Sequence, residues 1–240
     1  MLFSHTSLPA DRSANQLAQE PSSKQEPGQS TERSAERSAE RSAERNRAQA
    51  VLTFWFGAPD SETHGRYRKE WFVKSDRFDE QIRQQFLADI ENAASGDYDH
   101  WQNEAELAVA LLILLDQFPR NVYRGTPQSF ATDNKALSVA EHIVKTGGDK
   151  TLMPAYRFFV YVPFEHQEAI ASQDKAVEYM TQLNEENPHI DEGLKGGLDF
   201  AIRHREVIAR FGRFPHRNTI LGRESTAEEQ AFLKQPGSRF

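Results

Sequence analysis

Residues 211–223 combine side chains that bind anions with a side chain that can move protons. The segment reads Phe211-Gly212-Arg213-Phe214-Pro215-His216-Arg217-Asn218, and Arg223 follows shortly after it. Arginine offers a planar set of N–H donors that matches the oxygens of a carboxylate or a phosphate. A shorter copy of the same pattern, Gln117-Phe118-Pro119-Arg120-Asn121, stands much earlier in the chain. We expect the fold to bring the two segments together around a small anionic ligand. The expected ligand-binding residues are Arg120, Asn121, Arg213, His216, Arg217, Asn218 and Arg223.

The charge pattern around this segment favours binding over an ordinary solvated surface. Residues 203–223 contain six arginines, one acid and no lysine. A solvated surface normally mixes lysine with arginine, so arginine alone indicates recognition of a planar anion. The alternative is structural, because any single arginine more commonly forms an ion pair with an acid from a neighbouring helix.

His204 is the first candidate for proton transfer. It falls on the same face of the predicted helix as Phe200, Val207, Ile208 and Phe211. An imidazole on a core-facing stripe needs a partner for its polar nitrogens. It is therefore either a core histidine with satisfied hydrogen bonds or a general base at the floor of a pocket. Asp116, which follows the most apolar helix, is its expected partner.

A second source of acid–base groups is the segment Pro163-Phe164-Glu165-His166-Gln167-Glu168. His166 and the neighbouring carboxylates could move protons or hold a metal ion. Metal is the weaker interpretation, because the helices carry no His-x-x-x-His or Glu-x-x-His pair and nearby arginines would repel a cation. We expect no metal and no cofactor. The candidate catalytic residues are His204, His166, Asp116 and Glu165.

The composition divides the 240 residues into a tail and one domain. Residues 1–46 carry almost no large apolar side chain after Leu17 and include three copies of Glu-Arg-Ser-Ala. They are therefore expected to be a disordered low-complexity tail in which any helix is transient. Residues 47–240 are expected to form a single domain.

Charge and cysteine content exclude several classes of function. The net charge of −7 argues against nucleic-acid binding, which requires a basic surface. The chain has no cysteine, which excludes disulfides and thiolate chemistry. The longest apolar run, residues 107–115, is too short to span a bilayer. We expect a cytoplasmic protein without a membrane or nucleic-acid partner.

The periodicity of apolar residues predicts about eight helices and no strand pair, hence an all-α fold packed as antiparallel hairpins. The central helix is expected at residues 104–118, ended by Pro119. Pro163 is expected to interrupt another helix, with a new one starting at Glu165. Residues 190–211 read as one helix, and Thr226 with Glu229 spells a capping box.

Four motifs occur together and in order: Phe54-Trp55-Phe56-Gly57, residues 114–121, residues 163–168 and residues 211–223. In this the chain resembles the bacterial family called domain of unknown function 924, over roughly residues 48–236. The resemblance implies an all-helical fold similar to tetratricopeptide-repeat superhelices. It implies no activity or catalytic residue, and the tail lies outside the family pattern.

Three functions remain open at this point. The first is an arginine- and histidine-lined pocket for a small anion, with or without acid–base catalysis by the histidines. The second is a tetratricopeptide-like scaffold that binds a protein or peptide without catalysis, although no 34-residue repeat is visible. The third is a metal-dependent hydrolase. Convergence of His166, His204 and Arg217 within one closed pocket would favour the first. If these side chains are instead scattered under the surface, each with its own acid, the second function or a purely structural role is favoured.

Overall fold

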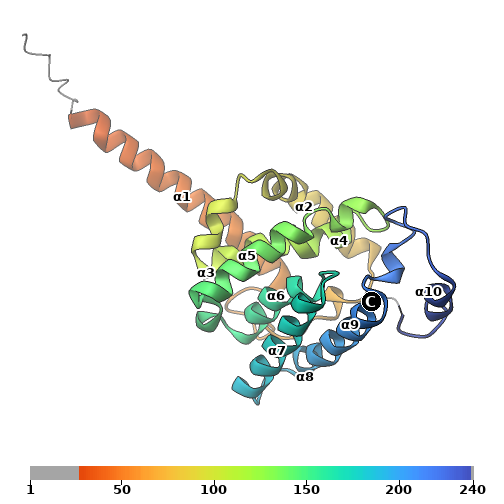
Figure 1. Ribbon diagram of the computed structural model, residues 1–240. Coiled ribbons are helices and arrows are strands. Elements are labelled where there is room, and N and C mark those ends of the chain that lie inside the picture. Colours follow the sequence, from red (N-terminus) through yellow and green to blue (C-terminus); the bar gives the residue numbers. More distant parts are fainter. Residues whose placement is uncertain (1–26, 239–240) are drawn as a thin grey trace, which may run out of the picture. The chain divides into compact units, whose positions relative to one another are not determined.

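The computed structural model describes residues 27–238, and the chain divides into two units, residues 1–41 and 42–240 (Figure 1). Part of the predicted tail, residues 1–26, lies outside the described residues. From residue 27 onward the chain is helical, as the first part of α1 (Pro27–Phe56). The helix has a local cause: alanine, glutamate and arginine are among the strongest helix formers, and the repeat contains neither glycine nor proline. That a helix over the repeat is transient stays a prediction.

The all-α prediction is confirmed, because the described residues form helices and no strand. The remaining elements, in chain order, are η1 (Lys69–Trp71), α2 (Asp76–Ser95), η2 (Asp99–Asn103), α3 (Ala105–Leu112), the π-helical turn η3 (Ile113–Gln117), α4 (Phe118–Val122), η4 (Pro127–Phe130), α5 (Asp133–Thr146), η5 (Gly148–Thr151), α6 (Pro154–Glu165), α7 (Ile170–Glu186), α8 (Glu192–Lys195), α9 (Gly197–Phe211), η6 (Pro215–Arg217) and α10 (Ala227–Phe232). Among residues 27–238, no helix combines the length and the apolar character that a bilayer span requires.

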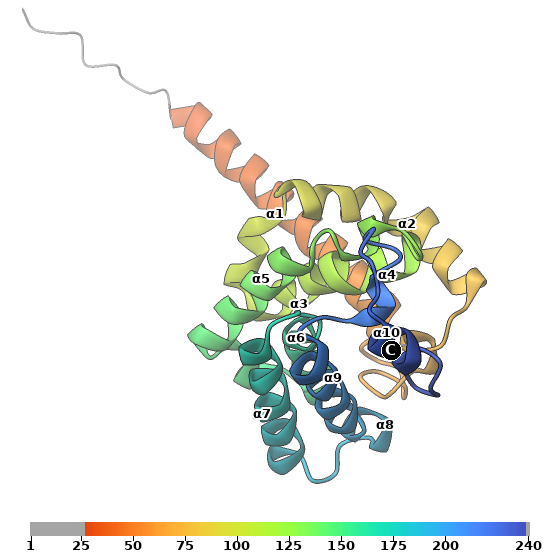
Figure 2. The same cartoon turned by 45° about the vertical axis from the view of Figure 1, so that its right-hand side comes forward.

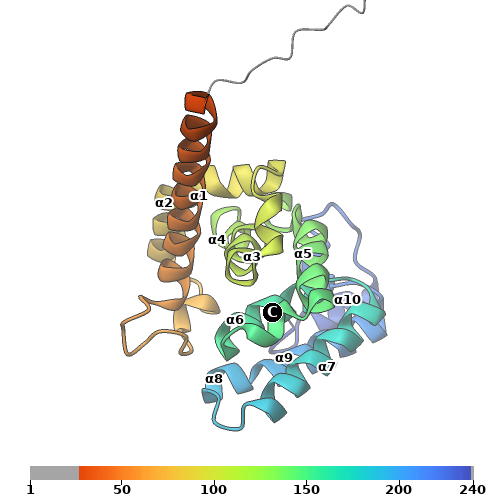
Figure 3. The same ribbon diagram turned by 90° about the vertical axis from the view of Figure 1, so that its left-hand side faces the viewer.

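The helices of residues 42–240 form two neighbouring groups. In Figures 1 and 2, α3–α5 (yellow-green to green) lie on one side and α6–α9 (teal to blue) on the other. Figure 3 shows the same division from another side, and α7 packs between α6 and α9. The helix α3 contacts both α5 and α6, so it joins the two groups.

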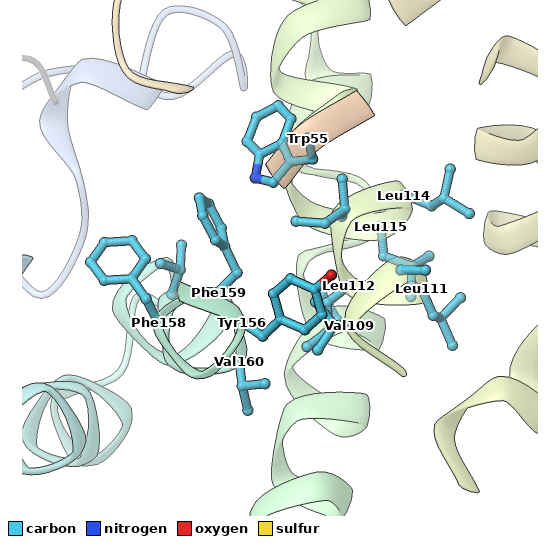
Figure 4. Close-up of a cluster of buried hydrophobic side chains, with 14 of the residues drawn as sticks. Trp55, Val109, Leu111, Leu112, Leu114, Leu115, Tyr156, Phe158, Phe159 and Val160 are labelled. Atoms are coloured by element: carbon cyan, nitrogen blue, oxygen red, sulfur yellow. The ribbon is translucent and has the colours of Figure 1, made fainter. Parts of the chain in front are cut away.

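The predicted central helix is the buried centre of this arrangement. Residues 108–115, in α3 and η3, are at most 1% exposed. Figure 4 shows Trp55 from α1, Leu115 from η3 and Phe159 from α6 gathered in this core, and the rings of Trp55 and Phe159 are 5.5 Å apart. An all-round apolar helix needs neighbours on every side, and the fold supplies them.

Pro119 does not end the central helix, which was the expectation. The chain passes through the π-helical turn η3 and continues as α4 to Val122, with Pro119 in the first turn of α4. Proline lacks the N–H that would reach the carbonyl four residues earlier, at Leu115. The hydroxyl of Thr132 donates to the Leu115 carbonyl instead. The insertion of a π turn and this substitute donor let the helix continue, and they place Asp116 and Gln117 at its irregular point.

Two other predicted helix boundaries are wrong. Pro163 lies inside α6, which runs to Glu165, so residues 166–169 connect α6 to α7 instead of starting a helix. The predicted helix at residues 190–211 is divided into α8 and α9. Gly197 is the first residue of α9, and a Cβ there would lie 2.2 Å from the ring of Phe158, so this position has room for glycine alone.

Two helix starts carry side-chain caps, and one of them is the predicted capping box. Ser75 caps α2 by accepting from the Phe78 N–H. The capping box of α10 is complete, with Thr226 and Glu229 each accepting from the other's backbone N–H. Both caps satisfy N–H groups that a helix start leaves without a partner inside the helix.

Candidate functional site

Six elements bring polar side chains to one place next to the buried centre. We call this group the polar cluster. Its members are Asp116 and Arg120 from η3 and α4, Asp133 from α5, Glu165, His166 and Glu168 from the end of α6 and its connection to α7, His204 from α9, and His216, Arg217 and Arg223 from the segment after α9. Figure 2 shows the segment after α9, in blue, passing close to α4. The predicted meeting of the two Phe-Pro segments is observed, and Asp133 is their common partner.

Asp116 and His166 form one carboxylate–imidazole pair. The Nδ1 atom of His166 lies 2.7 Å from Oδ1 of Asp116, which is 1% exposed as a side chain. Burial by itself would raise the pKa of Asp116. The positive charge of Arg120 and the contact with His166 outweigh burial and lower that pKa to about 2. Gln117 donates a further hydrogen bond to the same carboxylate. Asp116 is therefore an ionised acceptor at neutral pH.

Arg120 and Arg217 share the carboxylate of Asp133. Arg120 donates from both terminal nitrogens to the two oxygens of Asp133, at 3.0 and 3.1 Å. It also donates to the backbone carbonyl of Asp116 at 2.7 Å. Arg217 donates from Nη1 to Oδ2 of Asp133 at 3.2 Å. One carboxylate thus faces two guanidinium groups, so its charge is divided between them.

Arg217 is the less compensated of these two cations. Its guanidinium carbon lies 4.6 Å from the ring centre of Phe130 and 4.6 Å from that of Phe214. The Nε atom is buried and has no hydrogen-bond partner. Burial and the nearby charge of Arg120 lower the pKa of Arg217 from 12.5 to about 10, against the opposing attraction of Asp133. The site therefore holds a cation whose donors are only partly used.

A second carboxylate–imidazole pair joins α6 to α9. The Nδ1 atom of His204 lies 2.9 Å from Oε1 of Glu165 and 2.9 Å from the backbone carbonyl of Phe200. Both side chains are less than 10% exposed. The expected partner of His204 was Asp116, and that expectation is wrong: Glu165 takes the position, because Glu165 ends α6 on the side that faces α9.

His216 lies within the electrostatic reach of the other two histidines. Burial and the charge of Arg217 lower the pKa of His216 to about 3, and His204 and His166 contribute in the same direction. Its ring lies 5.6 Å from that of Phe214. His216 is therefore neutral over the physiological range of pH, and it lines the cluster as a polar, uncharged side chain.

Glu168 fastens the segment after α9 to the rest of the cluster. It accepts from the backbone N–H of Phe214 at 2.8 Å and forms a two-pronged ion pair with Arg223. Burial would raise the pKa of Glu168, but the hydrogen bonds from Arg223 and Phe214 lower it. Arg223 also donates to the side chain of Asn218 at 3.0 Å. These contacts fix the position of Arg217, which stands between Phe214 and Arg223 in the sequence.

Three of the predicted ligand-binding residues donate to acidic side chains that are not members of the polar cluster. Arg213 and Asn218 both donate to Glu229 on α10. Asn121 is not brought into the cluster, because its side chain donates to Asp79 on α2 at 2.7 Å. Asp133 was not among the predicted site residues, because an acid before an apolar helical pattern is typical of a helix start. Phe130 was missed for lack of any sequence signal.

Two surface cavities of about 310 and 300 Å³ lie elsewhere, one lined by Arg45, Leu52 and Glu104 with their neighbours, the other by Lys175 and Tyr179 with theirs. The polar cluster itself reaches the surface through partly exposed side chains, with Arg120 at 20% and His166 at 15%. Within the described residues, no group of three or more histidine or carboxylate side chains is placed to hold a metal ion.

Comparisons with known proteins identify the family. The family model described as bacterial protein of unknown function (DUF924) matches residues 51–237. A solved structure of a protein of unknown function, ATU0120 from Agrobacterium tumefaciens, is 38% identical and superposes with a TM-score of 0.66, covering 78% of this chain and 96% of that one. No curated protein matches the chain. The chain therefore belongs to the DUF924 family of bacterial proteins, as its four motifs predicted.

Proposed function

We propose that the polar cluster binds a small anionic ligand, a carboxylate or a phosphate compound, with Arg217 as its anchor. The observation that supports the proposal is the state of the Arg217 guanidinium. The Arg217 side chain is only 7% exposed, yet its Nε atom has no hydrogen-bond partner. A buried donor without a partner is costly, so such donors are common where a ligand completes the hydrogen bonding.

The electrostatics point in the same direction. Asp133 is already held by both terminal nitrogens of Arg120, so it neutralises Arg217 only in part. An anion at the free edge of Arg217 would add a charge-assisted hydrogen bond and relieve the repulsion between the two guanidinium groups. The rings of Phe130 and Phe214 also contact the guanidinium group, and its unpartnered Nε–H remains for recognition of an anion.

Ligand binding can be tested by thermal unfolding with inorganic phosphate, followed by a panel of phosphorylated and carboxylated metabolites. At a ligand concentration of about 100 times Kd, the expected stabilisation is ~2.7 kcal/mol. For a domain of this size that raises Tm by about 5 to 10 °C. The variant Arg217→Met should lose this shift. The matched control is Arg205→Met, which removes an exposed arginine of α9 that pairs with Asp174.

The outcome that contradicts the proposal is equally specific. If no phosphate or carboxylate compound raises Tm, or if Arg217→Met retains the full shift of the best compound, Arg217 is a structural arginine. A shift that disappears equally in Arg205→Met would indicate general charge effects and not a site.

A second candidate is a surface that binds a protein or peptide, as in the scaffold hypothesis. It is favoured by three exposed apolar side chains close together in the connection between α1 and α2. Tyr67 is 37% exposed, Phe72 50% and Val73 48%, and the first two rings are stacked 5.8 Å apart. Neither of the two cavities described above is lined by these residues. We therefore rank this candidate second, and the tetratricopeptide-like superhelix and the cytoplasmic location stay predictions.

A metal-dependent hydrolase is the least supported of the three functions. It required Asp116, His166 or His204 to coordinate one point together. In the described structure each histidine instead makes its contact with a different carboxylate, His166 with Asp116 and His204 with Glu165.

A further inference from the structure

The two carboxylate–imidazole pairs of the polar cluster are chemically different. His204 has its Nδ1 atom within 2.9 Å of both Glu165 and the Phe200 carbonyl, and its side chain is 7% exposed. His166 makes its Nδ1 contact with Asp116 alone, and its side chain is 15% exposed. His166 is therefore the histidine that a ligand can approach, and His204 is built into the packing between α6 and α9.

The contact with Asp116 fixes the tautomer of His166. Asp116 is ionised and accepts hydrogen bonds only, so Nδ1 of His166 must carry the proton. In the neutral ring, the lone pair then lies on Nε2. Among residues 27–238, no hydrogen bond is made to Nε2 of His166. A histidine oriented at one nitrogen by a buried carboxylate, with the other nitrogen open, is the arrangement that general bases use.

The titratable side chains that face His166 come from four elements. Asp116 and Arg120 face it from η3 and α4, Asp133 from α5, and His216 from η6. Burial and the positive charge of Arg120 lower the pKa of His166, against the opposing effect of Asp116. The ring is therefore neutral at physiological pH and able to accept a proton. The dipole of α6 acts in the opposite direction, because His166 caps the C-terminal end of this helix, where a positive charge is favoured.

We propose that Asp116 and His166 form a proton-transfer pair that acts on the anionic ligand of the cluster, with Nε2 of His166 as the base. The substrate class is a phosphate or carboxylate ester that is attacked by water. The proton moves from that water to Nε2, and the water oxygen forms a bond to the phosphorus or carbonyl carbon with the electron pair of its O–H bond. The bond from that atom to the leaving oxygen breaks, Asp116 balances the imidazolium that has formed, and Nε2 returns the proton to the leaving oxygen. Asp116 is a positioning residue, because it acts through His166.

The proposal rests on the anion site proposed above, and one experiment separates the two. Nuclear magnetic resonance of the ¹⁵N-histidine-labelled full chain reports the tautomer of each ring. Diethylpyrocarbonate modification, mapped by mass spectrometry, reports the reactivity of each unprotonated ring nitrogen. In the wild type we expect the Nδ1–H tautomer at His166 and modification of its Nε2 at least about tenfold faster than that of His204. Inorganic phosphate should slow the modification of His166, and Arg217→Met should remove that protection.

Variants of Asp116 test its positioning role. Asp116→Asn should lose the Nδ1–H tautomer and slow the modification of His166, whereas Asp116→Glu should retain part of both. His189→Gln, the matched control at an exposed histidine outside the polar cluster, should leave both signals of His166 unchanged. The wild-type spectrum needs no variant, so a failure of Asp116→Asn to fold does not weaken the test.

Each result decides one part. An Nε2–H tautomer at His166, or modification no faster than at His204, overturns the proton-transfer proposal. Fast modification of His166 that phosphate does not slow leaves the pair standing as a reactive base but refutes the anion site beside it.

Discussion

Replacement of Arg217 by methionine should leave the protein about as stable as the wild type, although the side chain is buried and makes an ion pair with Asp133. The lowering of its pKa from 12.5 to about 10 means that the folded protein disfavours the charged form. At ~1.4 kcal/mol for each tenfold change in acidity, this is an electrostatic penalty of ~3 kcal/mol. Arg217→Met removes that penalty.

The same substitution also removes favourable contacts. The guanidinium stacks on the rings of Phe130 and Phe214, and each such contact is worth about 0.5 to 2 kcal/mol. Methionine keeps part of this packing, since its thioether makes favourable contacts with aromatic rings. Asp133 keeps its two-pronged partner Arg120. The losses and the relieved penalty nearly cancel, so the free energy of unfolding should change by less than about 1 kcal/mol.

The control is Arg120→Met in the same cluster. Burial would lower the pKa of Arg120, but Asp116 and Asp133 outweigh it and raise that pKa, so this cation is stabilised where it stands. Its removal leaves two buried carboxylates without their main partner and should cost about 3 to 5 kcal/mol. Urea unfolding at pH 7.5, followed by circular dichroism, gives both values. A loss of more than about 2 kcal/mol in Arg217→Met, or one equal to that of Arg120→Met, would refute the argument that Arg217 is held at an electrostatic disadvantage for a ligand.

Two further predictions concern His216 and Gly197. The folded pKa of His216 lies near 3, below the ordinary 6.5, so below pH 6.5 the unfolded chain binds a proton that the folded chain does not. Its contribution to stability is therefore complete above pH 6.5 and falls with pH by up to ~1.4 kcal/mol per unit down to about pH 3. Urea unfolding at pH 7.5, 5.5 and 4.5 should show that the free energy of unfolding falls less steeply with pH in His216→Gln than in the wild type. The control His189→Gln, at an exposed histidine, should follow the wild type. The same pH dependence in all three proteins would contradict this prediction. Gly197→Ala should lower the free energy of unfolding by about 1 to 3 kcal/mol, because the new Cβ would lie 2.2 Å from Phe158. In the control Gly196→Ala the new Cβ meets nothing nearer than 3.4 Å, so the free energy of unfolding should change little. Equal thermal stability of the two variants would contradict this prediction.

Much of the fold follows from local patterns that need no tertiary information. The apolar run at residues 107–115 is the core because no arrangement of a chain in water leaves such a helix uncovered. The caps at Ser75 and Thr226 were predictable, since they satisfy N–H groups within a few residues of themselves. Two of the three errors fall at Pro119 and Pro163, where helices continue through a proline, and the third is the division of residues 190–211 into α8 and α9. At Pro119 the hydroxyl of Thr132 replaces the lost donor, and that hydroxyl comes from another part of the chain.

The candidate site shows the same division. Sequence by itself marked Arg120, His166 and Arg217, because arginine beside Phe-Pro and histidine beside glutamate are unusual combinations with recognisable chemistry. It assigned the wrong partner to His204 and overlooked Asp133, because the identity of a partner depends on which helix ends meet, and only packing decides that. The difference between Arg120 and Arg217 is also tertiary. The two side chains are chemically identical, and one is fully compensated while the other is not, because a single carboxylate from α5 lies between them and can satisfy only one of them completely.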